Sequence, residues 1–150
     1  MRVLLPLPLA LLLVGCTALP VDVEGTFDRA SGGTLVVGVS EHPPWVHVDD
    51  EGRVTGSEAD LITSFADSIY ADVEWTAGPE SVLADKVRRG EVDVVVGGLT
   101  ASSPWMSSMA LTRPYQTVAG EKMVMGVRLG ENELLVNLER HLAREFGEIQ

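Results

Sequence analysis

Short apolar runs alternate with amphipathic stretches along most of the chain, and this alternation predicts an α/β fold. Continuous apolar runs at 35–39 and 92–96 are typical of strands buried on both faces of a sheet. Apolar residues at helical spacing predict helices over 57–70, 80–89 and 134–146. We therefore expect a mostly parallel central sheet flanked by helices, with a final strand and a C-terminal helix returning to it.

Weaker patterns complete this domain. Two short β-prone segments, 46–48 and 53–55, flank a turn-forming Asp49-Asp50-Glu51-Gly52 and predict a hairpin. Further strands are expected at 73–76 and 123–127, and the stretch from 97 to 115 is expected to be irregular. Two single residues are also placed by the pattern: Ser57 as the N-cap of its helix, and His141 on the surface of the last helix.

The start of the chain has the pattern of an export signal. The apolar run 3–14 is too short to span a bilayer and is typical of the apolar part of a signal peptide. It ends at Leu13-Val14-Gly15-Cys16, which resembles the lipobox of a bacterial lipoprotein precursor. We expect removal of the signal peptide 1–15 and lipidation of Cys16. The alternative is an ordinary secretory peptide cut near Ala18, and both predict an exported protein.

The segment after Cys16 has no helical or alternating period and contains Pro20, Gly25, Gly32 and Gly33. Residues 16–32 are therefore expected to form a lipidated N-terminus and a flexible tether, and residues 33–150 the folded domain. One cysteine cannot form an internal disulfide, so the stability of this domain depends on its core.

Composition and charge narrow the possible functions. The chain has 150 residues, of which 45% are hydrophobic and 22% charged, as expected for one globular domain. Without Arg2, ten basic residues face 22 acidic ones, a net charge of −12, which argues against nucleic acid as a partner. His42 and His47 have no compact metal-ligand spacing, and no catalytic motif is present. We expect no metal, no cofactor and no enzymatic activity.

Topology places a candidate site. Ligands of open α/β sheets bind beyond the carboxyl ends of the strands, so the loops 40–45 and 97–102 are expected to line it. For Trp45 two interpretations are open, a platform for a ligand or a hydrophobic plug. For Gly97 and Gly98 they are an amide-lined concavity and a plain turn.

A set of short motifs lies between Gly33 and Tyr115. The motifs are Gly33-Thr34-Leu35-Val36-Val37-Gly38-Val39, Pro43-Pro44-Trp45, Gly52-Arg53-Val54-Thr55-Gly56, Asp60-Leu61, Gly90-Glu91-Val92-Asp93-Val94-Val95-Val96, Gly98-Leu99-Thr100 and Pro114-Tyr115. Together, in this order and spacing, they resemble family 3 of the bacterial extracellular solute-binding proteins.

The resemblance implies a periplasmic-binding-protein-like fold and the transport of amino acids or related solutes by ABC importers, with two lobes closing around the solute. After Tyr115, however, the chain reaches the returning strand and final helix within a few residues, so we expect a single lobe without the second. In the family's Thr-x-Thr-x-x-Arg motif, Thr100 is kept, Ser102 replaces the second threonine, and Trp105 replaces the carboxylate-binding arginine. Arg113 is a candidate substitute cation, and the alternative is a solvent-exposed loop arginine.

The sequence therefore predicts a membrane-anchored solute-binding lipoprotein on the outer face of the cell membrane or in the cell envelope. It would bind a small polar solute weakly, because a half-site leaves part of the solute in water. The expected contacts are Glu41, Trp45, Glu58, Gly98, Thr100, Ser102, Trp105 and Arg113. The alternative is a module that docks to an ABC permease, a sensor or a second copy through a cleft face with Trp105, Met106 and Met109. A third is a poorly folding remnant of a deletion.

Overall fold

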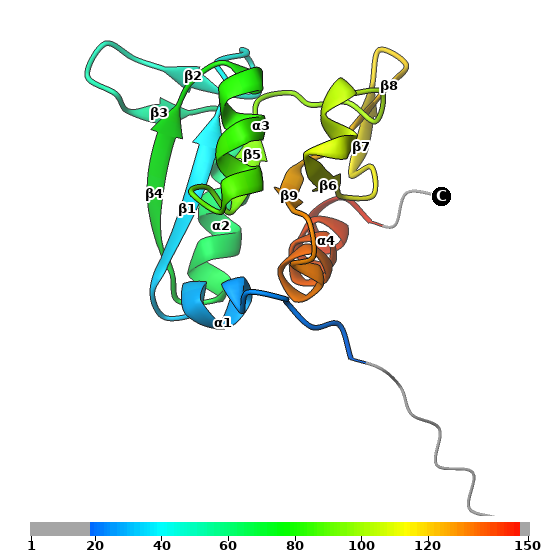
Figure 1. Cartoon of the computed structure of the whole chain (residues 1–150). Coiled ribbons are helices and arrows are strands. Elements are labelled where there is room, and N and C mark those ends of the chain that lie inside the picture. Colours follow the sequence, from blue (N-terminus) through cyan, green and yellow to red (C-terminus); the bar gives the residue numbers. More distant parts are fainter. Residues whose placement is uncertain (1–18, 148–150) are drawn as a thin grey trace, which may run out of the picture.

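A five-stranded sheet forms the centre of the protein, in a computed structural model that describes residues 19–147 (Figure 1). The strand order is β4-β1-β5-β9-β6. β1 pairs in parallel with β4 and β5, whereas β9 pairs antiparallel with both β5 and β6, so only β9 runs in the opposite direction. The strands are β1 (Thr34–Val39), β4 (Asp72–Ala77), β5 (Val94–Val96), β6 (Met109–Leu111) and β9 (Gly126–Arg128).

Helices cover both faces of this mixed sheet, which confirms the predicted α/β architecture. One face packs against α1 (Thr26–Ala30), α2 (Ser57–Ser68) and α4 (Asn132–Phe146), and the other against α3 (Glu80–Arg89). The first core contains Ile62 and Phe65 of α2, with Leu134, Leu138 and Leu142 of α4. The second contains Leu83 and Val87 of α3. The sheet is therefore buried on both sides, as its continuous apolar strands predict.

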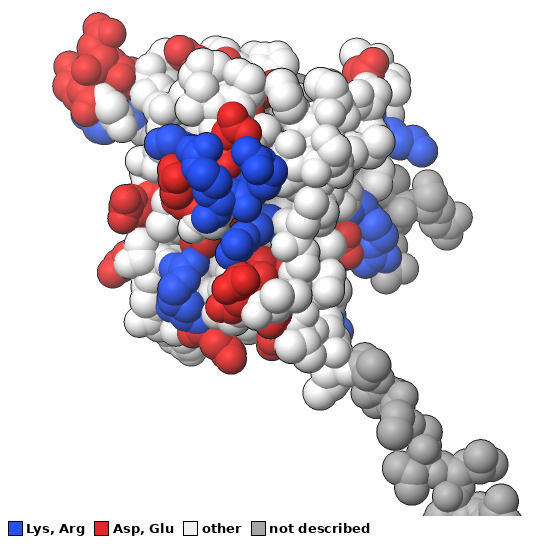
Figure 2. Space-filling model, in the orientation of Figure 1, with Lys and Arg blue, Asp and Glu red and all other residues white. Residues whose placement is uncertain are grey.

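Basic side chains gather over α3 on the face that Figure 2 displays. Lys86, Arg88 and Arg89 occupy the last turn of this helix. Cations at a helix C-terminus interact favourably with the helix dipole, and Arg88 and Arg89 also form ion pairs with Asp85 and Glu91. These basic side chains therefore stabilise the C-terminal end of α3.

Two hairpins extend from the sheet. β2 (His47–Val48) pairs with β3 (Val54–Thr55) as predicted. The irregular stretch expected at 97–115 contains a 3-10 helix, η1 (Pro104–Ser107), together with β6. The strand expected at 123–127 is divided between β8 (Glu121–Met123) and β9, because β8 pairs with β7 (Gln116–Val118) outside the central sheet. Three-residue strands carry too little periodicity for a pattern to locate them.

The β7–β8 hairpin leads the chain directly back to the central sheet, at the point where the sequence predicted that a second lobe is missing. Val118 pairs with Glu121, so only Ala119 and Gly120 form the turn. Both have positive φ, 50° and 84°, as in the tight primed turns that match strand twist. After this turn β9 inserts between β5 and β6. The described residues therefore form one lobe, with the final strand and helix returning to it as predicted.

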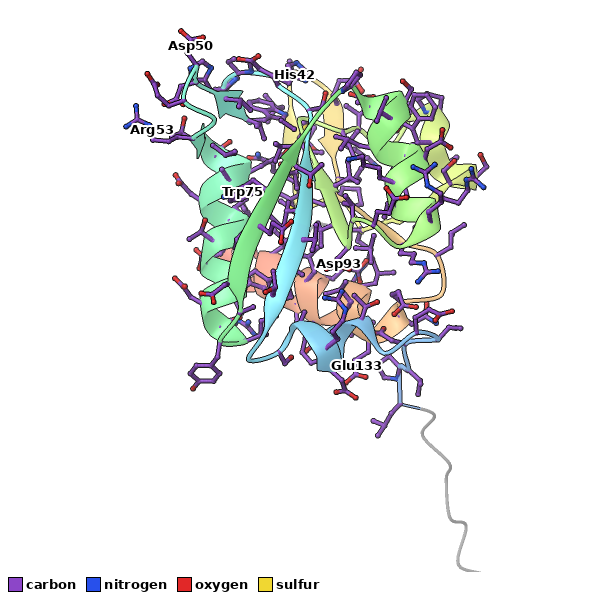
Figure 3. The ribbon with its side chains drawn as sticks, turned by 60° about the vertical axis from the view of Figure 1, so that its left-hand side comes forward. His42, Asp50, Arg53, Trp75, Asp93 and Glu133 are labelled. Atoms are coloured by element: carbon purple, nitrogen blue, oxygen red, sulfur yellow. The ribbon has the colours of Figure 1, made fainter. Side chains whose placement is uncertain are left out.

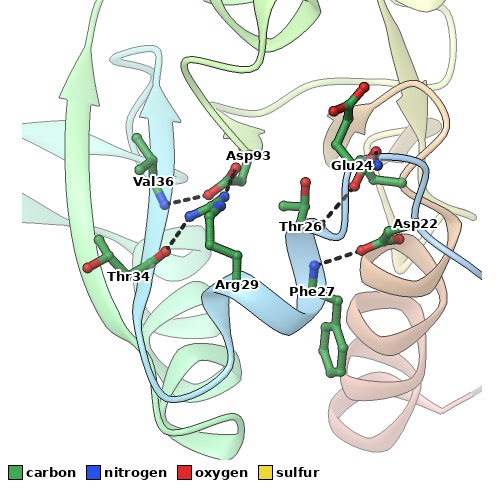
Figure 4. A network of polar contacts seen from close by, with 9 residues as sticks. Asp22, Glu24, Thr26, Phe27, Arg29, Thr34, Val36 and Asp93 are labelled. Carbon is green, nitrogen blue, oxygen red and sulfur yellow. Dashed lines mark hydrogen bonds and ion pairs between the residues drawn. The ribbon is translucent and has the colours of Figure 1, made fainter.

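The expected tether is folded from Asp22 onward, contrary to the prediction of flexibility through residue 32. Asp22 accepts hydrogen bonds from Phe27 N (2.7 Å), Glu133 N (2.6 Å) and Leu134 N (3.0 Å), so it caps α1 and α4 together. Glu131 returns the contact by accepting from Glu24 N and Thr26 N, both at 3.0 Å (Figure 4). These caps satisfy helix-end amides that would otherwise lack partners.

Two single-residue predictions were wrong. Ser57 is the first residue of α2 and Gly56 takes the N-cap position, with no side-chain cap hydrogen bond. His141 is buried, because it lies edge-on against Phe65 between α4 and α2. The signal peptide 1–15 and Cys16 lie outside the described residues.

Candidate functional site

The loops that follow β1 and β5 meet at the carboxyl edge of the sheet, as the topology predicted. Ser40 N donates to Val96 O over 3.0 Å, and His42 Nδ1 lies 3.0 Å from Gly97 O. Because a carbonyl oxygen only accepts, Nδ1 of His42 carries the proton in this contact. Figure 3 shows His42 at this edge and Asp93 toward the opposite one.

Glu58 lies beneath these loops and is completely buried. Its Oε2 accepts hydrogen bonds from Gly97 N (2.8 Å) and Gly98 N (2.9 Å), and its Oε1 accepts one from the Tyr115 hydroxyl (2.6 Å). Both carboxylate oxygens are therefore engaged inside the protein. Glu58 positions the loop after β5, and the structure does not present it to a solute, contrary to its predicted role as a contact.

The burial of this carboxylate changes the acidity of both partners. Burial raises the pKa of Glu58, and the hydrogen bonds from Tyr115, Gly98 and Gly97 offset only part of the rise. Burial and the adjacent Glu58 charge raise the pKa of the Tyr115 hydroxyl far above its usual value. Tyr115 is therefore a permanent hydrogen-bond donor at physiological pH.

Trp45 covers the turn that Glu58 holds. Gly98 has φ 69°, and a Cβ at this position would lie 2.4 Å from Cδ1 of Trp45 and 2.6 Å from Nδ1 of His42. Only glycine fits so close an approach. The indole is half-buried against the first core and stacks with the His42 ring at a centroid distance of 6.3 Å. This packing corresponds to the plug interpretation of Trp45.

An open hollow of about 420 Å³ lies beside these loops, at the carboxyl ends of β1 and β4. Of the predicted contacts only Glu41 lines it, and the Glu41 carboxylate pairs with His47 Nδ1 over 3.0 Å. The acidic turn Asp49-Asp50-Glu51 projects from the neighbouring β2–β3 hairpin (Figure 2). The hollow is lined by Val39, Ser40, Glu41, Val48, Ala77, Gly78 and Pro79.

Two polar pairs flank this region. The hydroxyls of Thr100 and Ser102 lie 2.9 Å apart on the exposed loop after β5. Trp105 donates its Nε1–H to Glu80 Oε2 over 2.9 Å at the start of α3. The indole of Trp105, which the sequence analysis expected in place of a cation, is therefore bonded to a carboxylate.

Arg113, a predicted solute contact, and Met109, predicted on the exposed cleft face, both lie away from these positions. Arg113 does not join the site: its Nε pairs with Glu139 of α4 over 3.2 Å and its side chain is exposed. Met109, expected on an exposed cleft face, is buried at 1% exposure in the second core. Met106 is exposed as expected.

Within residues 19–147, no three His, Cys, Asp or Glu side chains are grouped so that they could hold a metal ion. Over the same range, no helix combines the length and apolar character needed to cross a bilayer.

Comparison with known proteins assigns the family. Residues 35–142 match the family described as bacterial extracellular solute-binding proteins, family 3. The chain belongs to this family. Its family and fold are those of binding proteins, and its relatives are extracellular or periplasmic. The probable histidine-binding protein of Neisseria gonorrhoeae is 28% identical over 76 residues, which are 51% of this chain and 28% of that protein. The chain thus matches less than a third of this curated relative.

Solved structures of arginine-binding proteins share the fold. A variant of the arginine-bound form of domain 1 from TmArgBP, of T. maritima, has a TM-score of 0.72 and 24% identity, covering 80% of this chain and 97% of that chain. An ancestral arginine-binding protein bound to arginine has a TM-score of 0.67 and 16% identity, covering 77% and 94%. The first of these is a single domain, as the described lobe is.

Three residues at the site were missed as such by the sequence analysis. Tyr115 entered only as part of a motif and Glu80 only as a helix start, whereas His42 was placed in the candidate loop 40–45 without a role of its own. The Pro-Pro-Trp loop that contains His42 and the motif that contains Tyr115 were the available signals. No local pattern indicates that Glu80 meets Trp105, because 25 residues separate them.

Proposed function

We propose that this protein is a single-lobe solute-binding module that binds a small polar solute, an amino acid or a related amine, at the carboxyl edge of its sheet. It acts without catalysis and without a cofactor. The observation that carries the proposal is the buried Glu58 carboxylate, which holds the Gly97-Gly98 turn from below. Burying a carboxylate is costly, and here its hydrogen bonds fix the loop that faces the candidate site.

The charges around the hollow favour a solute with a cationic group. Glu41 lines the hollow and Glu80 stands at the start of α3. In the acidic turn of the β2–β3 hairpin, Asp49 and Glu51 pair with Arg53, which leaves Asp50 as its remaining negative charge. A carboxylate group on the solute has no arginine to meet, because Trp105 replaces it. Structural relatives described as bound to arginine support a cationic solute.

The remaining contacts are proposed on the loop after β5. We propose contacts from the Gly98 backbone, from the Thr100 and Ser102 hydroxyls, which lie on an exposed loop, and from the half-buried rings of Trp45 and Trp105. Arg113, which pairs with Glu139, is proposed only as a distant rim charge. Because one lobe cannot enclose a solute, we expect weak binding.

Calorimetric titration of residues 16–150 with arginine, histidine, simple amines and small carboxylates tests the proposal. We expect saturable heat for a cationic member of the panel, weakened by Glu41→Gln and by Ser102→Ala. Thr117→Val, on the exposed strand β7, is the matched control and should leave the heat unchanged. Silence across the panel would overturn solute binding and favour the docking module instead.

We also propose that the protein is exported and anchored by lipid on Cys16 after removal of residues 1–15. The motif that ends at Cys16 supports this anchoring, and the family's extracellular or periplasmic setting supports export. A partnership with an ABC permease is proposed on the family relation alone. Mass spectrometry of the protein from its native membrane tests the anchor. An N-terminal Cys16 that carries acyl chains is expected, and a free N-terminus near Ala18 would contradict it.

A further inference from the structure

Glu80 is a carboxylate beside the hollow whose charge no basic side chain of the described lobe neutralises. It is the first residue of α3, and the three residues before it, Ala77, Gly78 and Pro79, line the hollow. None of the ion pairs within residues 19–147 includes Glu80. Its side chain is half-buried. A negative charge therefore stands next to the hollow without a cation of the lobe to balance it.

The indole of Trp105 holds this carboxylate in place. Its Nε1–H donates to Glu80 Oε2 over 2.9 Å, whereas Oε1 makes no hydrogen bond with any residue that the structure describes. The Trp105 ring packs against the second core, and its backbone N–H donates to the Ser103 hydroxyl at the start of η1. An indole donates a hydrogen bond but carries no charge. This contact therefore fixes the position of the carboxylate and leaves its negative charge for another partner.

The loops around the hollow contain no lysine or arginine that could hold a solute carboxylate. These loops are 40–45, 77–80 and 97–105. Their one histidine, His42, directs its Nδ1–H to the Gly97 carbonyl. In the neighbouring β2–β3 hairpin the basic residues are His47 and Arg53, and each already forms an ion pair with an acid. A solute carboxylate would therefore meet fixed negative charges, whereas an ammonium or guanidinium group would meet charges of opposite sign.

We propose that Glu80 determines the charge class of the solute, and that this solute is a cationic amine or guanidine without a carboxylate. Glu80 is the specificity-determining residue, because its free oxygen can accept a charge-assisted hydrogen bond from such a group. Trp105 is the positioning residue that holds Glu80. The negative charges of Glu41 and Glu80 select against a solute that carries a carboxylate of its own. This inference rests on the proposed function and narrows its solute from amino acids and amines to amines.

Three probes that differ at one group test the charge class. NMR titrations of residues 16–150 compare arginine with agmatine, which lacks the carboxylate of arginine, and with arginine methyl ester, in which the carboxylate charge is masked at nearly the same size. We expect agmatine and the ester to bind about tenfold more tightly than arginine, since neither presents a like charge to the acids of the site.

The outcomes separate this inference from the proposed function. If arginine binds as tightly as agmatine, solute binding stands and the selection against a carboxylate is wrong. If the ester binds as weakly as arginine, size and not charge sets the preference, and the inference fails. No response to any of the three probes would overturn the inference together with cationic solute binding.

A pair of variants tests the assignment to Glu80. Glu80→Gln keeps the shape of the side chain and an oxygen acceptor for Trp105, but it removes the charge. We expect the preference for agmatine over arginine to fall from about tenfold to about threefold or less. Glu133→Gln is the matched control, because it removes the same charge at the amino edge of the sheet, where β1, β4 and β5 begin, opposite His42 (Figure 3). Equal losses in the two variants would reduce the effect to net charge and contradict the role of Glu80.

The role of Trp105 has a spectroscopic test. Trp105→Phe keeps an aromatic ring but removes the donor to Glu80, and circular dichroism checks that the variant is folded. The indole N–H signal that is missing from its NMR spectrum belongs to Trp105. In the native chain this signal should shift on addition of agmatine, and the shift should be at least halved in Glu80→Gln. A signal that does not respond to agmatine, together with an unchanged preference in Trp105→Phe, would make Trp105 a purely structural residue and overturn its positioning role.

Discussion

The two ends of the sheet both bury carboxylates against backbone N–H groups, but they do so in opposite electrostatic settings. At the carboxyl edge, burial raises the pKa of Glu58 despite three hydrogen bonds. At the amino edge, burial also acts to raise the pKa of Glu131. Hydrogen bonds from Thr26 and Glu24 outweigh that effect, with help from Arg128, so the pKa lies below its usual value.

This difference separates a functional device from a structural one. The Asp22–Glu131 exchange ties the first and last helices together, and the lowered pKa of Glu131 favours its ionised form. Glu58 instead fixes the loop that faces the candidate site, although its ionised form is disfavoured there. Arrangements that sacrifice local stability are typical of binding and active sites. Glu58 is therefore the buried carboxylate that we associate with function.

Removing the carboxylate at the site edge should have the largest effect. Glu58→Ala leaves two loop amides and the Tyr115 hydroxyl without their partner, and we expect a loss of about 3–5 kcal/mol of unfolding free energy in denaturant titrations. Glu58→Gln keeps an acceptor for the amides and should recover at least half of the loss. Equal losses for the two variants would show that one acceptor oxygen of the same volume does not suffice and that the site edge needs both carboxylate oxygens.

At the amino edge, Asp22→Ala should cost somewhat less, about 2–4 kcal/mol, since it removes caps from α1 and α4 together. Denaturant titration measures the loss. The matched control is Glu24→Ala in the same segment, whose side chain makes no hydrogen bond within residues 19–147, and whose effect should stay within about 0.5 kcal/mol. If Asp22→Ala leaves the free energy of unfolding unchanged, the segment before α1 does not stabilise the lobe.

The sequence predicted more of the carboxyl edge than of the amino edge. Continuous apolar strands predicted the sheet, and topology predicted that the loops after β1 and β5 meet. The Asp22 contacts with α4 span 111 residues or more, and no local period encodes such a meeting. For Glu58, the pattern placed it in the first turn of α2 but could not tell that its side chain turns inward. Arg113 was misplaced because Glu139, its partner, lies 26 residues away.

The response to pH should have opposite signs at the two edges. Because the pKa of Glu58 is raised, its contribution is fully present below the unfolded value of about 4.5 and is lost as pH rises through the folded pKa. For Glu131 the pKa is lowered, so its contribution is present above about 4.5 and is lost as pH falls through the folded pKa.

Difference curves measure these contributions. Unfolding free energies between about pH 3 and 8 are compared for the native chain with Glu58→Gln and, separately, with Glu131→Gln. We expect the first difference to decline with rising pH and the second to increase, each by about 1.4 kcal/mol per unit of pKa shift. Curves that slope in the same direction would remove the electrostatic contrast between the edges.

The smallest expected effect concerns the left-handed residue at each edge, Ala119 in the β7–β8 turn and Tyr70 after α2. Asn-Gly is the preferred pair for a two-residue primed turn, so Ala119→Asn should stabilise the lobe by about 0.5–1 kcal/mol. Tyr70→Asn relieves the same backbone strain, so thermal unfolding in solution should show a similar gain. An unchanged midpoint of unfolding for both variants would show that neither left-handed residue costs the lobe stability.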